Sequence, residues 1–158
     1  MVITMRSQIL GLGGWLLLTF LTALSGAFFM PGEWYDRLIK PWWNPPNWVF
    51  PIVWTVLYIM MANAAWLVWR EKGFSGAGFA LQLFIAQLVV NALWSYLFFG
   101  LHSPFLALLD VIVMWLMILA TLIAFWQVNQ FAGILMIPYL VWVSIAAFLN
   151  FTIWRLNS

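Results

Sequence analysis

The sequence contains no cysteine and very few charged side chains. Its 158 residues include six basic and four acidic side chains, together 6% of the chain, and a single histidine. The absence of cysteine excludes disulfides, thiolate metal ligands and iron–sulfur clusters. Because typical globular chains are about 25% charged, so few charges cannot cover a water-facing surface. The basic residues form no run or stripe, which leaves no electrostatic footprint for nucleic-acid binding.

Hydrophobic residues make up 66% of the chain, and they occur in long runs. A helix that crosses a membrane needs about 20 apolar residues. The runs predict an all-α fold, in which one membrane domain (residues 1–158) forms a bundle of five transmembrane helices with short connections. We therefore expect a multi-pass integral membrane protein, although nothing indicates which membrane. The predicted spans are residues 9–30, 49–69, 79–99, 105–126 and 131–154.

An odd number of spans places the two termini on opposite sides of the membrane. It also places the loop before the second span, His102 and Arg155 on one side. Three basic residues fall on each side, so the positive-inside rule predicts no orientation. The two groups are Arg6, Arg70 and Lys72, and Arg37, Lys40 and Arg155.

The most unusual stretch is Lys40–Tyr58, KPWWNPPNWVFPIVWTVLY, which holds four tryptophans and four prolines. Pro45 and Pro46 exclude a regular helix in its first half, because each lacks a backbone donor and restricts the preceding residue. An apolar run without a charge then continues to Arg70. This rigid aromatic loop is either an interfacial belt of tryptophans or one wall of a ligand cavity.

Polar and aromatic side chains recur at helical spacing in three of the predicted spans. Polar groups inside a bilayer are costly unless paired, so each is a candidate for function. The amides could instead hold neighbouring helices together. If the three stripes converge, they form an apolar pocket with a few orienting polar groups. The stripes are Trp54, Tyr58, Met61 and Ala65; Gln87, Asn91, Trp94, Ser95 and Phe98; and Tyr139, Trp142, Ala146 and Asn150.

Two ionisable residues raise further alternatives. Asp110 lies about two turns into the fourth span, so it is either proton-linked or held by a partner on a neighbouring helix. His102 has the chemistry of an axial haem ligand, but its position beside Ser103 and Pro104 favours an ordinary loop residue. A single histidine without a carboxylate cluster predicts no metal site.

Several motifs, in order and at matching spacing over nearly the whole chain, resemble the translocator protein family, also called tryptophan-rich sensory proteins (TspO/MBR). They are Trp34-Tyr35-Asp36, the Lys40–Tyr58 block, Gln87 with Asn91 and Trp94, Phe98-Phe99-Gly100, Leu109-Asp110, Pro138-Tyr139-Leu140 with Trp142, and Leu149-Asn150-Phe151.

The resemblance implies a five-helix bundle, usually dimeric, that binds porphyrins and synthetic isoquinoline-type ligands in a pocket beneath the first loop. Porphyrin or haem would be the ligand, and no cofactor is required. Relatives use the tryptophans that match Trp54 and Trp142 in light-dependent porphyrin breakdown, so these two are candidate catalytic residues. The ligand-binding residues that the resemblance implies are Tyr35, Trp43, Pro45, Trp54, Tyr58, Asn91, Trp94, Trp142 and Ala146.

A sterol is a weaker candidate ligand. Animal members of the family carry a sterol motif with a central tyrosine near the end of the fifth span. The matching segment here, Leu149–Arg155, has Phe151 at that position. The missing hydroxyl weakens the case for sterol binding by this motif.

A porphyrin is a flat apolar disc with anionic edges, so it needs an aromatic slot and basic groups at the mouth. Trp54, Trp94 and Trp142 could form the slot. Arg37 and Lys40 lie in the loop above it, either for the ligand or as interfacial anchors. Three functions remain open: a tetrapyrrole-binding sensor or carrier, an enzyme that degrades porphyrin oxidatively in light, and a transporter with proton coupling at Asp110.

Overall fold

The computed structural model describes residues 4–158, where the regular secondary structure is entirely helical. Four helices are long and apolar enough to cross a membrane, counting the π-helical turn η1 as the end of α3. A single turn, α2, interrupts the loop after the first of them. The elements are α1 (Met5–Phe28), α2 (Glu33–Asp36), α3 (Val49–Ser95), η1 (Tyr96–Gly100), α4 (Pro104–Val128) and α5 (Gln130–Leu156).

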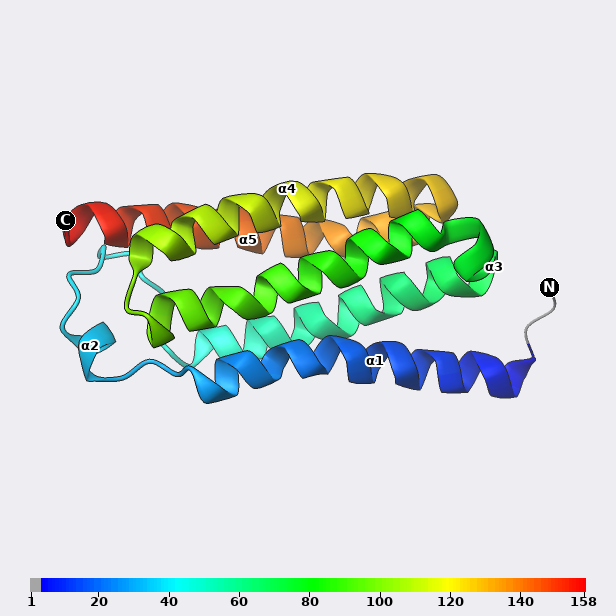
Figure 1. The fold of residues 1–158 in the computed structure, drawn as a ribbon, viewed down its shortest axis with the longest axis horizontal. Coiled ribbons are helices and arrows are strands. Elements are labelled where there is room, and N and C mark those ends of the chain that lie inside the picture. The colour runs from blue at the N-terminus through cyan, green and yellow to red at the C-terminus, as the bar shows by residue number, and fades with distance from the viewer. Residues whose placement is uncertain (1–3) are drawn as a thin grey trace.

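Helix α3 is folded into two arms that run side by side (Figure 1). Its backbone leaves the helical region at Gly73 (φ 63°, ψ −176°) and at Ala77 (φ −127°, ψ 24°). Positive φ is readily adopted only by glycine, so Gly73 makes the reversal possible. Across the arms, the Tyr58 hydroxyl donates to Asn91 Oδ1 at 3.4 Å. The predicted second and third spans lie on these two arms, so the bundle has four long helices or five helical segments.

The predicted boundary between those two spans was placed too early. The predicted second span ends at residue 69, just before Arg70, Glu71 and Lys72, but the first arm continues as helix through them and breaks at Gly73. Charged residues have good helix propensity, and at the end of a membrane helix they reach water without interrupting it. The backbone geometry of glycine, and not the charge, sets the end of the arm.

The other long helices surround α3, which packs against α1, α4 and α5. Helices α4 and α5 also pack along each other. The start of α1 and the end of α5 lie at opposite ends of the bundle, as an odd number of segments requires (Figure 1). The core contains fully buried small and aromatic residues, whereas large apolar side chains cover the outside, as a lipid environment permits. Examples of the first are Ala64, Ala65 and Phe84, and of the second Leu17, Leu116 and Phe148.

The loop between α1 and α3 closes one end of the bundle, which we call the loop end. Trp34 stacks on His102 at 4.5 Å between ring centroids, with 8° between the ring planes. The backbone of Ile39 makes two hydrogen bonds with the side chain of Asn157, just after α5. These contacts confirm that the loop, His102 and the end of the last helix share one side.

Candidate functional site

A hydrogen-bonded network joins the three predicted stripes inside the bundle. The Tyr139 hydroxyl on α5 donates to Gln87 Oε1 at 2.6 Å. The same hydroxyl accepts from Asn91 Nδ2 at 2.7 Å. Tyr58 on the first arm of α3 completes the chain through Asn91. All four side chains are buried, so helical spacing alone had gathered residues that meet in space.

Two polar atoms near this network are buried without a partner among the described residues. They are Gln87 Nε2 and Asp110 Oδ2. We considered a partner on a neighbouring helix as one role for Asp110, and the described residues provide none for this oxygen. A buried polar atom without a hydrogen bond costs about 1–3 kcal/mol, so each such atom requires an explanation.

An aromatic layer lies beside the network. Trp54 is tilted over Tyr58, with centroids 5.5 Å apart, and meets Tyr139 edge-on at 6.1 Å. Trp142 on α5 meets Phe50 edge-on at 5.9 Å. The indole nitrogen of Trp142, Nε1, is buried and has no hydrogen-bond partner among residues 4–158. Trp54 and Trp142 are thus half-buried against the core and do not simply face lipid.

Trp94 has a different setting from the other two tryptophans of the predicted slot. Its indole N–H donates to Asn150 Oδ1 at 2.9 Å, and Asn150 Nδ2 donates to the Pro104 carbonyl at 2.8 Å. Its ring stacks on Phe98 at 4.9 Å. Trp94 packs against both the main core and a smaller cluster at the loop end, so it connects the two.

The loop residues of the predicted site cover the loop end. Tyr35 is buried against Phe98 and Phe99, with the Lys40 ammonium 4.5 Å from the centre of its ring. Burial raises the pKa of the Tyr35 hydroxyl above its ordinary value, and the charge of neighbouring Asp36 adds to the rise. Trp43 stacks on Phe148 of α5 at 5.5 Å. The remaining two predicted residues, Pro45 and Ala146, are half-buried.

Two cavities lie outside this aromatic layer. One, of about 410 Å³, opens at the loop end and is lined by Trp34, Arg37 and His102, among others. The other, of about 280 Å³, is an apolar groove between α1 and α3 near the opposite end. No predicted ligand-binding residue lines either cavity. Between α3 and α5, Trp54 instead packs against Tyr58 and Tyr139, and Trp142 packs against Phe50.

Several residues at the loop end were not predicted as parts of a site. Phe50 and Phe148 face Trp142 and Trp43, while Asn157 holds the loop backbone. Phe50 lies within the Lys40–Tyr58 block, so its position in the sequence could have indicated it as a candidate site residue. Nothing in the sequence distinguishes Asn157 from an ordinary polar residue after a span. Across the described residues, no group of three metal-ligating side chains could hold a metal ion.

Comparison with known proteins agrees with the sequence motifs. Residues 14–155 match the family model described as TspO/MBR family. A tryptophan-rich sensory protein of Cereibacter sphaeroides is 49% identical, over 90% of this chain and 91% of that protein. The tryptophan-rich protein TspO of Chlorobaculum tepidum is 42% identical, over 97% and 99%. The translocator protein of Homo sapiens is 38% identical, over 91% and 88%. The chain therefore belongs to the TspO/MBR family, and with its long apolar helices it is an integral, multi-pass membrane protein.

Proposed function

We propose that the protein binds a porphyrin or a related tetrapyrrole beneath the loop and acts as a membrane sensor or carrier of that ligand. In this proposal the five helical segments each cross the membrane once, and two copies form a homodimer. The ligand lies between α3 and α5, against the aromatic layer of Trp54 and Trp142.

The observation that carries the proposal is the buried indole N–H of Trp142, which has no hydrogen-bond partner within residues 4–158. Leaving such a donor unpaired costs about 1–3 kcal/mol, which a ligand acceptor would recover. The carboxylate oxygens of a tetrapyrrole are acceptors of this kind. The ring of Phe50 beside it, and the ring of Trp54 in the same aromatic layer, supply flat apolar surface for the macrocycle.

Charge at the loop end also supports an anionic ligand. Lys40 lies over the Tyr35 ring and donates to the Leu38 carbonyl at 3.3 Å, and none of the described acidic residues forms an ion pair with it. Arg37 is 3.3 Å from Glu33, and both side chains are largely exposed. An exposed pair of this kind is worth about 0–1 kcal/mol, so Arg37 can exchange Glu33 for a ligand carboxylate.

Ligand entry requires the loop to move, because the aromatic residues contact one another. Trp43 on Phe148 and Trp34 on His102 are the stacking contacts that would open. Loops that cover binding sites are commonly among the less stable parts of a structure. The loop would then act as a cover that closes over bound ligand.

Titration of the purified protein with protoporphyrin IX, followed by tryptophan fluorescence, tests the proposal. Quenching should saturate, and Trp142→Phe should weaken binding about tenfold through loss of the donor. Trp42→Phe is the matched control, because Trp42 lies in the loop, is 95% exposed and is not one of the predicted ligand-binding residues. Equal affinities of wild type and Trp142→Phe would refute the site.

A second candidate function is oxidative breakdown of porphyrin in light. The supporting observation is that Trp54 lies edge-on to Tyr139. An excited porphyrin can take an electron from a stacked indole, Tyr139 is close enough to return one to the indole, and dissolved dioxygen would be the oxidant that breakdown of the porphyrin consumes. Loss of the porphyrin absorption band should be faster in illuminated than in dark samples, and Trp54→Phe should abolish that difference. If porphyrin were lost at the same rate with the Trp54→Phe variant and in detergent alone, the light-dependent loss would be background photochemistry and not an activity of the protein.

Transport with proton coupling at Asp110 is a weaker alternative, supported by its buried Oδ2 atom, for which the described part of the chain provides no hydrogen-bond partner. Uptake of porphyrin into proteoliposomes should depend on a proton gradient, and Asp110→Asn should remove that dependence. Uptake that is insensitive to the substitution would exclude Asp110 as the coupling residue.

A further inference from the structure

The apolar groove between α1 and α3 is not part of the proposed tetrapyrrole site. It lies near the end of the bundle opposite the loop, where α3 reverses at Gly73 (Figure 1). Its volume is about 280 Å³. The residues that shape it are Gly11, Gly14, Trp15, Trp69, Phe74 and Ile85.

Two glycines of α1 create the groove. A Cβ atom at Gly11 would lie 2.2 Å from Cζ3 of Trp69, so the indole ring rests directly on the glycine backbone. A Cβ atom at Gly14 would meet nothing within 4 Å, so the missing side chain there leaves open space. Trp15 is buried next to this space, and its ring lies 6.1 Å from Phe74. Phe74 is 63% exposed and forms a rim that a bound molecule would cover.

The lining of the groove selects an apolar occupant. Every side chain that lines it is apolar, the indole nitrogens aside, and it opens on the outer surface of a membrane protein. Pockets for drug-sized ligands span about 300–1,000 Å³, so a groove of about 280 Å³ is too small for a whole lipid and has room for part of one hydrocarbon chain. The rest of such a molecule must lie at the end of the bundle, beside Phe74.

The charges at this end favour an anionic headgroup. Arg6, Arg70 and Lys72 are all exposed there, against the single acid Glu71. Within residues 4–158, none of the three basic side chains lies within 4.0 Å of an acidic one. Glu71 Oε2 instead accepts from Asn129 Nδ2 at 2.8 Å.

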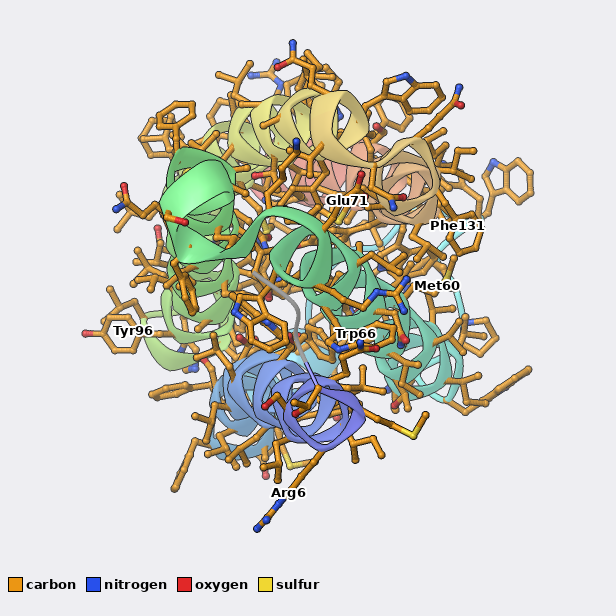
Figure 2. All side chains as sticks on the ribbon, turned by 90° about the vertical axis from the view of Figure 1, so that its right-hand side faces the viewer. Arg6, Met60, Trp66, Glu71, Tyr96 and Phe131 are labelled. Atoms are coloured by element: carbon orange, nitrogen blue, oxygen red, sulfur yellow. The ribbon has the colours of Figure 1, made fainter. Side chains whose placement is uncertain are left out.

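Figure 2 looks at this end of the bundle, with Glu71 on the side away from α1 and Arg6 extending outward from α1. The guanidinium of Arg70 lies 4.6 Å from the ring centre of Trp66. Lys72 lies two residues before the rim residue Phe74, next to the break at Gly73, and the carbons of its side chain lie against Gly76. Juxtamembrane basic residues attract anionic lipids, each contributing about 1 kcal/mol near the surface.

We propose that this groove is a binding site for an anionic phospholipid, with one acyl chain between α1 and α3 and the phosphate near Lys72. The apolar lining explains why an acyl chain would bind. The three basic side chains, which have no acidic partner within residues 4–158, explain why the headgroup would be anionic. The site is separate from the tetrapyrrole proposal, so either can fail without the other.

Native mass spectrometry of the detergent-purified protein, mixed with equal amounts of dioleoylphosphatidylglycerol and dioleoylphosphatidylcholine, tests the site. The wild type should retain one phosphatidylglycerol in preference to phosphatidylcholine. Gly14→Leu fills the groove and should reduce retention of both lipids. Gly13→Leu is the matched control, because its Cβ also meets nothing within 4 Å but Gly13 does not line the groove.

The headgroup is tested separately. Lys72→Gln should lower the preference for phosphatidylglycerol about fivefold, the effect of one basic residue near the surface. Arg155→Gln, at the loop end, should leave the preference unchanged. Circular dichroism verifies that each variant folds. If Gly14→Leu does not fold, Phe74→Ala takes its place, because it removes the rim of the groove and should also reduce lipid retention.

Three results would overturn the proposal. The first is equal retention of the two lipids by the wild type. The second is equal lipid retention by Gly14→Leu and Gly13→Leu. If Gly14→Leu does not fold, the corresponding result is equal lipid retention by Phe74→Ala and the wild type. The third is a change in the monomer–dimer ratio of Gly14→Leu without loss of lipid, which would assign the groove to a second copy of the chain.

Discussion

The side chain of Asn157 holds the peptide backbone of Ile39 from both sides. Its Oδ1 accepts from the Ile39 N–H at 2.9 Å, and its Nδ2 donates to the Ile39 carbonyl at 2.8 Å. The same Nδ2 also donates to the Ile153 carbonyl of α5 at 2.8 Å. One amide thus ties the middle of the loop to the end of the last helix, so loop and α5 are mechanically linked.

Replacing Asn157 with alanine should loosen the loop. The two hydrogen bonds to the loop are lost, each worth about 1 kcal/mol, so opening of the loop should become roughly thirtyfold more frequent. Hydrogen exchange of the amides around Ile39 would measure this, and porphyrin should associate faster. Ser158→Ala is the control, because the Ser158 hydroxyl donates to the Trp154 carbonyl and not to the loop. Unchanged exchange at Ile39 would show that other contacts hold the loop.

Tyr139→Phe should destabilise the bundle. The change keeps the ring but leaves Asn91 Nδ2 and Gln87 Oε1 without their partner inside the core. Loss of one partner of a buried hydrogen bond costs about 1–3 kcal/mol. Unfolding by sodium dodecyl sulfate in mixed micelles would measure the loss. The exposed Tyr96 provides a control, since Tyr96→Phe should change stability little.

The helical class, the spans and the buried network could be predicted because each depends on local spacing. Tyr58, Asn91 and Tyr139 meet because a helical period placed each on an inward face, and a bilayer core penalises polar groups that face outward. The end of the first arm of α3 could not be predicted from charge. It depends on Gly73 adopting positive φ, which the sequence permits but does not require.

The arrangement of the loop could not be predicted either. The contact of Asn157 with Ile39 joins residues 118 positions apart. The stack of Trp34 on His102 depends on where the irregular backbone places both rings. No periodic pattern encodes such contacts, since loops lack the fixed geometry that makes helical faces readable. The resemblance to a family located the loop as functional, but not the residues that hold it.

Raising the pH above 10 should weaken the docking of α2. Burial raises the pKa of Tyr35, so folding favours the neutral phenol over the phenolate. This contribution is complete below the unfolded pKa of about 10 and disappears as the pH rises through the higher folded value. The difference in absorbance at 295 nm between wild type and Tyr35→Phe would follow this titration. A midpoint at or below the ordinary value would contradict the burial of Tyr35.

Alanine substitutions at two neighbouring glycines of α1 should have opposite effects. A Cβ atom at Gly11 would lie 2.2 Å from the Trp69 ring, so Gly11→Ala forces the indole to move. Overpacking of this kind costs about 1–3 kcal/mol. The Cβ of Gly13 would meet nothing within 4 Å, and alanine in a helix interior is favoured over glycine by about 0.5–1 kcal/mol. The unfolding temperatures of the two variants, measured in the same detergent, should therefore lie on either side of the wild-type value, with Gly11→Ala below it and Gly13→Ala above it. If Gly11→Ala unfolded at the wild-type temperature, Trp69 would have to leave α1 without cost, and the packing of α1 on α3 would not depend on this contact.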